Sequence, residues 1–200
     1  MSSDVDATLL PATAAYLAAL PAGLASHPDC HAKASLYRAF IGERAPPGLP
    51  DVLVDLMQHP RPVTAWIPEV HSHALLLAHY DMLGHDHASF ARFTYDSQRE
   101  LWQSKLYGFL MKLVSPARLI TSAGKRWAQF HRGSSLDARE LGACEGELVL
   151  RHPSCLYDEI SLIGLTEGLR AVLDVSRVPS RLRLMHHDDL GARWHVEWND

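Results

Sequence analysis

The sequence predicts an α+β fold in which helices come first and a small antiparallel sheet follows. Apolar residues recur at helical spacing up to Gly133, where the pattern changes. Near the other end the pattern alternates, with Trp194, Val196 and Trp198 on one face, as in a half-buried strand. Helices grouped before strands are typical of α+β proteins. We therefore expect an N-terminal helical bundle followed by a small four-stranded antiparallel sheet with one helix, in the order ββαββ.

Prolines divide the helical part into segments, because proline suits the first turn of a helix and interrupts its interior. The prolines that stand where a helical pattern begins are Pro11, Pro28, Pro50, Pro68 and Pro116. The expected helices cover residues 11–20, 28–43, 50–59, 68–83, 86–114 and 116–131.

The last third of the chain predicts two hairpins joined by a helix, because short alternating segments flank a longer helical one. The expected elements are strands 135–141 and 145–152, a helix over 157–175, and strands 181–187 and 192–198. We divide the chain into an N-terminal extension with one helix, residues 1–26, and a single α+β domain, residues 27–200. Within that domain the helical part covers 27–133 and the ββαββ part covers 134–200.

The composition is that of an ordinary globular protein: the chain of 200 residues is 47% apolar and 21% charged, with a net charge of −4. No basic stripe of the kind that binds nucleic acid is present. The three cysteines, Cys30, Cys144 and Cys155, form no C-x-x-C pair, and such a sparse, odd count is typical of a reducing compartment. We expect a cytoplasmic protein without a nucleic-acid partner.

Residues 7–26 carry no charge, yet they do not predict a membrane segment. Pro11 and Pro21 interrupt the run and alanine dominates it, whereas a membrane-spanning helix needs about 20 strongly apolar residues. Asp4 and Asp6 precede the run, where a secretory signal would carry basic residues. We expect neither membrane insertion nor export.

The ββαββ tail is preceded by four short motifs: Trp66-Ile-Pro-Glu69, Lys105-Leu-Tyr107, Leu113-Val-Ser-Pro116 and the stretch from Arg126 to Gly133. In these motifs the chain resembles an uncharacterised bacterial family of about this length, typical of myxobacteria. That family is similar to the ligand-binding superfamily of heme nitric-oxide sensors, 4-vinyl-reductase domains and TRAPP trafficking-complex subunits. The likeness covers roughly residues 28–198. It implies a pocket between the helices and the sheet, or a surface for protein partners.

The resemblance raises the question of heme, since the heme sensors use an axial histidine and a Tyr-x-Ser-x-Arg motif that grips the heme propionates. The chain contains Tyr95-Asp-Ser97-Gln-Arg99, which matches by letter. In the sensors this motif lies on the first strand of the C-terminal hairpin, whereas here it falls in an expected helix and the strand near Ser135 lacks it. Heme is therefore not the favoured cofactor. If it were bound, the axial candidates would be His71, His73 and His79.

A metal site is a further alternative, because the chain has 13 histidines. His71-x-His73 and His85-x-His87 flank the helix expected over 68–83. Residues two apart on a helix point away from each other, so the first pair cannot hold one ion without distortion. A structural zinc site needs four ligands, and no local cluster supplies them. A site built from two such clusters stays open, with His71, His73, His79, His85 and His87 as candidates.

Enzymatic chemistry has little support in the sequence. There is no G-x-S-x-G, no H-E-x-x-H and no phosphate-binding loop. Cys155 lies three residues after His152, yet catalysis would also need a lowered thiol pKa and an orienting third group, which a sequence does not show. We assign no catalytic residue.

These observations favour a non-enzymatic ligand-binding or sensory domain with a pocket between helices and sheet. We expect a small apolar ligand, with pocket walls from Trp102, Phe109, Trp127 and Cys155. One alternative is a protein–protein interaction module that forms a homodimer through its helices. Another is a heme- or metal-binding protein. The sequence leaves the identity of the ligand or partner open.

Overall fold

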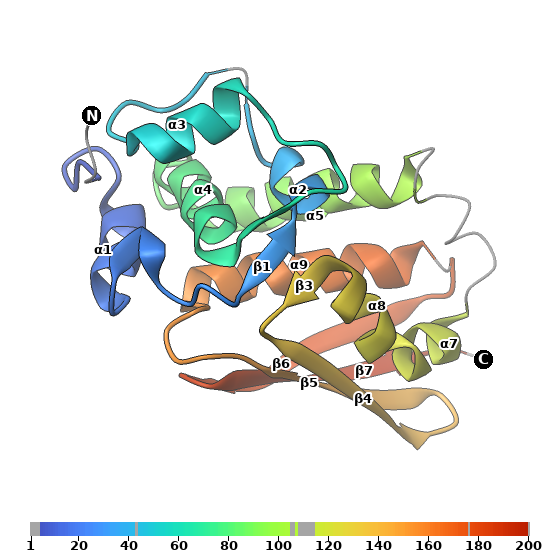
Figure 1. Ribbon diagram of the computed structural model, residues 1–200. Helices are drawn as coiled ribbons and strands as arrows, with labels where there is room; N and C mark the ends of the chain where they lie inside the picture. The colour runs from blue at the N-terminus through green and yellow to red at the C-terminus, as the bar shows by residue number, and fades with distance from the viewer. Residues whose placement is uncertain (1–4, 43, 105–106, 108–114, 176, 200) are drawn as a thin grey trace.

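The computed structural model describes residues 5–42, 44–104, 107, 115–175 and 177–199 (Figure 1). The helices in these ranges are α1 (Pro11–Ala19), the short 3-10 turn η1 (Gly23–Ala25), α2 (Ala34–Arg38), α3 (Asp51–Gln58), α4 (Glu69–Met82), α5 (His87–Gln103), α7 (Pro116–Thr121), α8 (Ala123–Phe130) and α9 (Glu159–Asp174). The strands are β1 (His31–Lys33), β2 (Trp66–Pro68), β3 (His131–Arg132), β4 (Ser135–Gly142), β5 (Glu145–Arg151), β6 (Ser180–Asp188) and β7 (Gly191–Trp198). The predicted α+β class is confirmed.

The larger sheet has the strand order β4-β5-β7-β6 and is antiparallel throughout. Its alternation follows the sequence pattern. On β7, Ala192, Trp194 and Val196 are buried, while Arg193, between Ala192 and Trp194, is exposed. Figure 1 shows α9 lying over one face of this sheet, with α5 and α4 beyond it. The core therefore lies between the sheet and the helices, as the ββαββ pattern predicts.

A second, three-stranded sheet with the order β2-β1-β3 was not predicted. It corrects the helix expected over 28–43: the chain turns at residues 27–30, pairs as β1 and becomes helical only at Ala34. Ala32 opposes Ile67 on one side and His131 on the other. Strands of two or three residues are too short to show alternation, and their partners are distant in the chain, so sequence periodicity does not indicate them.

Two expected helices are also shorter or divided. The helix expected over 116–131 breaks at Ser122, whose ψ is 4°, into α7 and α8. The helix expected over 86–114 is described as α5 up to Gln103, and most of the remainder lies outside the described residues. Gly124 lets α8 approach the sheet closely, because a Cβ at this position would lie 2.8 Å from the carbonyl oxygen of Leu136 on β4.

The N-terminal helix α1 is attached to α4 through a buried carboxylate. The residue at the N-cap of α1 does not cap the helix with its own side chain. The carboxylate of Asp81, on α4, caps the helix instead. Asp81 accepts hydrogen bonds from the backbone amides of Ala12 and Thr13, at 2.9 and 3.0 Å, and from the Thr13 hydroxyl at 2.7 Å. A carboxylate at a helix N-terminus satisfies amides that the helix itself leaves unpaired.

Within the ranges that the structure describes, no helix combines the length and apolar character needed to cross a membrane.

Candidate functional site

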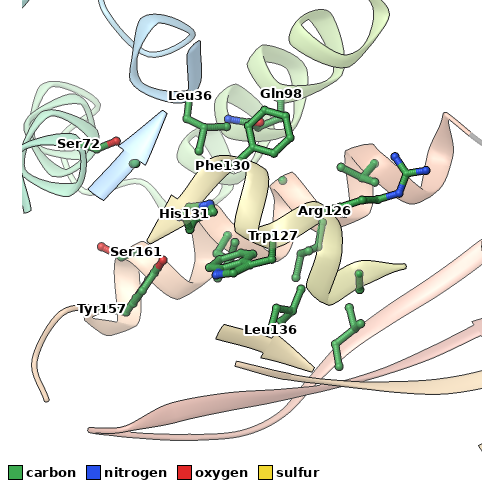
Figure 2. A pocket seen from close by; sticks show the side chains of 18 of the residues that line it. Leu36, Ser72, Gln98, Arg126, Trp127, Phe130, His131, Leu136, Tyr157 and Ser161 are labelled. Carbon is green, nitrogen blue, oxygen red and sulfur yellow. The ribbon is translucent and has the colours of Figure 1, made fainter. Parts of the chain in front are cut away.

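A cavity of about 180 Å³ lies between the helices and the larger sheet (Figure 2). Side chains of α2, α4, α5, α7, α8 and α9 line it, together with residues of β1, β3, β4 and β5. Most of the lining is aliphatic or aromatic, including Leu119, Leu148, Leu169 and Val172. A mainly apolar pocket between helices and sheet is the kind of space in which proteins hold small ligands.

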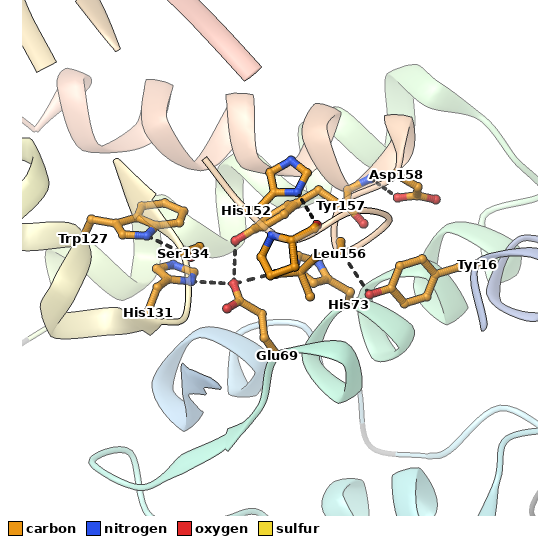
Figure 3. A network of polar contacts seen from close by, with 12 residues as sticks. Tyr16, Glu69, His73, Trp127, His131, Ser134, His152, Leu156, Tyr157 and Asp158 are labelled. Carbon is orange, nitrogen blue, oxygen red and sulfur yellow. Dashed lines mark hydrogen bonds and ion pairs between the residues drawn. The ribbon is translucent and has the colours of Figure 1, made fainter. Parts of the chain in front are cut away.

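One end of the cavity is polar and centres on Glu69, a fully buried carboxylate (Figure 3). Its Oε1 atom accepts a hydrogen bond from the Tyr157 hydroxyl at 2.5 Å and lies 2.7 Å from Nδ1 of His131. His73 Nε2 is 3.8 Å from the same oxygen, which is too long for a hydrogen bond but close enough for charge attraction. All four side chains line the cavity.

The polar network shifts the pKa values of Glu69 and Tyr157. Burial alone would raise the pKa of Glu69, but the charge and hydrogen bond of His131, with a smaller contribution from His73, outweigh it and lower the pKa to about 2. Burial, and then the negative charge of Glu69, raise the pKa of Tyr157 well above its usual value. Glu69 is thus a carboxylate and Tyr157 a neutral donor at physiological pH.

Local sequence explains how these groups reach the cavity. Pro68 ends β2 and stands at the N-cap of α4, so Glu69 occupies the first turn, where the helix dipole favours a negative charge. The Glu69 amide donates to the Cys30 carbonyl at 3.0 Å, which fixes the junction against β1. On β3 the side chains alternate: His131 points into the cavity, and Arg132 lies over the ring of Trp66.

Four polar atoms of cavity-lining residues are buried and have no hydrogen-bond partner among the described residues. They are Glu69 Oε2, His73 Nε2, Trp102 Nε1 and Ser161 Oγ. A buried polar atom without a partner costs roughly 1–3 kcal/mol, so four of them at one cavity call for an explanation.

The pocket residues expected from the sequence are placed as follows. Trp102 and Trp127 line the cavity, and Trp127 stacks on His131 with ring centroids 3.8 Å apart. Cys155 is partly buried in the loop before α9 and does not line it. Phe109 lies outside the described residues.

The five candidate histidines do not converge. His73 alone of them lines the cavity. His79 stacks on Phe93 at 3.6 Å, His85 lies 2.8 Å from a carboxylate oxygen of Asp81, and His87 packs near Tyr80. The ring of His71 is more than half buried and interacts with the backbone of Leu24. In the part of the chain that the structure describes, no group of three or more metal-ligating side chains is present.

The Tyr-x-Ser-x-Arg letters lie on α5, in the helix expected from the sequence. The Tyr95 hydroxyl donates to Asp174 on α9 at 2.6 Å, and Arg99 is exposed. None of Tyr95, Ser97 and Arg99 lines the cavity.

Sequence reasoning did not select Glu69, His131, Tyr157 or Ser161 as site residues. Two of them stand inside the motifs that carry the family resemblance, Glu69 after Trp66-Ile-Pro and His131 before Arg132-Gly133. The signal available was therefore an ionisable residue at the junction of two elements, within a motif that carries the family resemblance.

The chain was compared with known proteins. No protein-family model matches it, and no curated protein matches it in sequence. Solved H-NOX structures match it in fold. A variant of the H-NOX protein from T. tengcongensis aligns with a TM-score of 0.52 and 7% identity, over 70% of this chain and 80% of that one. A further variant, described as Tt H-NOX, gives 0.54 and 10% over 83% and 92%. A variant from K. algicida gives 0.54 and 8% over 84% and 97%.

The chain has an H-NOX-like fold. The alignment spans most of both chains, so the likeness includes the helical part and the sheet together. At 10% identity or less it establishes the arrangement of the elements, and the site must be judged on the side chains of this protein.

Proposed function

We propose that this protein is a non-enzymatic ligand-binding or sensory domain that holds a small, mainly apolar molecule in the cavity between its helices and its sheet. The observation that carries the proposal is a cavity of about 180 Å³ with apolar walls and unpartnered polar atoms at one end. An engineered apolar cavity of roughly 150 Å³ in another protein binds benzene, so this space suits a molecule of one small ring or a comparable branched chain.

Heme is the ligand that the fold family suggests, since one of the matching structures concerns heme distortion in the H-NOX family. One axial candidate, His73, lines the cavity, but the other side chains that a heme would need do not. The tyrosine, serine and arginine that would hold propionates lie on α5 away from the cavity. The volume of about 180 Å³ is below the ~300 Å³ at which pockets for drug-sized ligands begin, and a heme is larger than most of these.

A homodimer through the helices, the other alternative from the sequence, stays a prediction. The large apolar side chains that are exposed within the described ranges are spread over different elements: Leu9, Val52, Met82, Leu141, Met185 and Leu190. Apolar residues exposed singly are normal on a monomer surface.

The test measures the binding of toluene to the purified chain by ligand-observed NMR. The variant Val172→Phe is used to fill the cavity. Val172 lines the cavity, so the added ring occupies the space and should abolish toluene binding. Val52→Phe is the matched control, because Val52 is exposed on α3 and its variant should bind as the unaltered chain does. Equal binding of toluene to both variants would contradict the proposal, as would an unaltered chain that binds neither toluene nor a polar analogue of the same ring. A stoichiometric visible absorption band after hemin addition would overturn the argument against heme.

A further inference from the structure

We propose that the polar end of the cavity recognises the hydroxyl group of a small neutral alcohol, held by Glu69, His73 and Ser161. This inference rests on the proposed function, since it names the chemical class of the ligand in the same cavity. It starts from three of the four buried polar atoms in the cavity lining that have no hydrogen-bond partner among the described residues: Glu69 Oε2, His73 Nε2 and Ser161 Oγ, the fourth being Trp102 Nε1 on α5.

The three atoms come from two helices that meet at one end of the cavity. Glu69 and His73 are four residues apart on α4, and therefore on the same face of the helix. Ser161 lies in the first turn of α9, beside Tyr157, whose hydroxyl bonds to Glu69. Figure 2 shows Ser161 and Tyr157 next to each other at this end of the cavity.

A hydroxyl group matches these atoms in donors and acceptors. It donates one hydrogen bond and accepts up to two. Glu69 Oε2 is an acceptor only, while the His73 ring and the Ser161 hydroxyl can each donate. One alcohol oxygen can thus satisfy the carboxylate oxygen and one or both donors, and remove the cost of leaving them unpaired.

The charges at this end favour a neutral head group. Glu69 is a buried carboxylate whose opposite charge is already supplied by His131, at 2.7 Å from its other oxygen. A ligand carboxylate at this end would face Glu69 and be repelled; the cation Arg126, which also lines the cavity, lies away from Tyr157 and Ser161 (Figure 2). A ligand ammonium ion would lose its water of hydration beside His73 and His131, which costs free energy unless a carboxylate balances its charge. Glu69 is the only acidic residue in the cavity lining that the structure describes, and His131 already pairs with it.

The experiment compares four probes that share one ring and differ in the head group: toluene, benzyl alcohol, benzylamine and benzoate. Dissociation constants are measured by ligand-observed NMR on the full chain at pH 7. We expect benzyl alcohol to bind about tenfold more tightly than toluene, which corresponds to a typical net hydrogen bond, and both to bind more tightly than the two ions.

Variants assign the selectivity to these atoms. His73→Leu should bring the ratio between toluene and benzyl alcohol close to one while toluene binding is retained. The matched control is His79→Leu: His79 is on the same helix and also has an unpartnered buried nitrogen, but it stacks on Phe93 outside the cavity. That variant should keep the full ratio. Ser161→Ala gives the second reading should His73→Leu fail to fold, because the backbone amide of Ser161, not its hydroxyl, bonds to Asp158.

The outcomes separate the two proposals. Equal affinity for toluene and benzyl alcohol would overturn the hydroxyl inference and leave the proposed function standing. Tighter binding of benzylamine or benzoate would also overturn it. If none of the four probes binds, the polar atoms are satisfied by water alone and both proposals fail. An unchanged ratio in both Ser161→Ala and a folded His73→Leu would show that the selectivity arises elsewhere, and would contradict the assignment.

Discussion

Glu69 is the residue on which most of the site depends, because it links three elements through one carboxylate. Its Oε1 atom joins α4 to His131 on β3 and to Tyr157 in the loop before α9. Removing the charge leaves a partly buried histidine, His131, without its counter-charge and a phenol hydroxyl with a weaker acceptor. The cost therefore falls on the junction of α4, the small sheet and the loop before α9, and not on one contact.

We expect Glu69→Gln to lower the free energy of unfolding by about 3 kcal/mol, the scale found when one member of a buried ion pair is removed. Urea denaturation followed by far-UV circular dichroism measures the change. Glu100→Gln is the control, because Glu100 is exposed on α5 and its variant should stay within about 0.5 kcal/mol of the unaltered chain. A similar small effect for both variants would show that the network carries little stability.

The pH dependence of stability tests the same carboxylate. Because the pKa of Glu69 falls from an ordinary 4.5 to about 2 on folding, its contribution is complete above pH 4.5 and is lost as the pH falls toward 2. We expect the stability difference between the unaltered chain and Glu69→Gln to shrink from pH 5 to pH 3. Taking the difference between the two proteins cancels the contributions that other carboxyl groups make to the pH dependence, such as Asp86, whose pKa is also lowered. A difference that is constant over this range would place the pKa of Glu69 elsewhere.

At the scale of elements, the position of α8 against β4 decides where His131 and Trp127 point. Gly124 makes this approach possible, since a Cβ there would lie 2.8 Å from a backbone oxygen of Leu136, which cannot rotate away. Gly168 on α9 differs: a Cβ there would lie 3.5 Å from Cγ of Gln98, an ordinary contact distance.

Gly124→Ala and Gly168→Ala should therefore have opposite effects. Helix propensity alone favours alanine at both sites by about 1 kcal/mol. We expect Gly168→Ala to be neutral or stabilising, and Gly124→Ala to destabilise by roughly 1–3 kcal/mol because the helix must move off the strand. Thermal unfolding of the two variants measures the sign. Stabilisation by both would mean that α8 is free to shift.

The elements that the sequence predicts well are those whose pattern is long enough to repeat. The strands β4 to β7 and the helices α1, α3, α4 and α9 lie close to their expected ranges, because alternation or helical spacing persists across each. The small sheet was missed for the opposite reason. β3 has two residues, and its pairing with β1 depends on how α8 is packed.

At the scale of the whole molecule, the cavity combines residues from β1 near the start to α9 near the end. The sequence indicates its apolar walls, because Trp102 and Trp127 stand on helical faces that repeat. It does not indicate the polar end. Glu69 meets His131 across 62 residues and Tyr157 across 88, and such encounters follow from topology, not from local spacing. The role of the two tryptophans in binding stays a prediction until toluene binding is measured.

Because the cavity draws its lining from both the helical part and the sheet, it exists only when the whole fold is formed. A molecule that occupies it is bound by the folded chain and released by the unfolded one, so occupancy and folding are thermodynamically linked. At a free ligand concentration of a hundred times the dissociation constant, the free energy of unfolding would rise by about 2.7 kcal/mol. Resistance to proteolysis would rise with it. The protein's lifetime in a cell would itself report how much of its ligand is present.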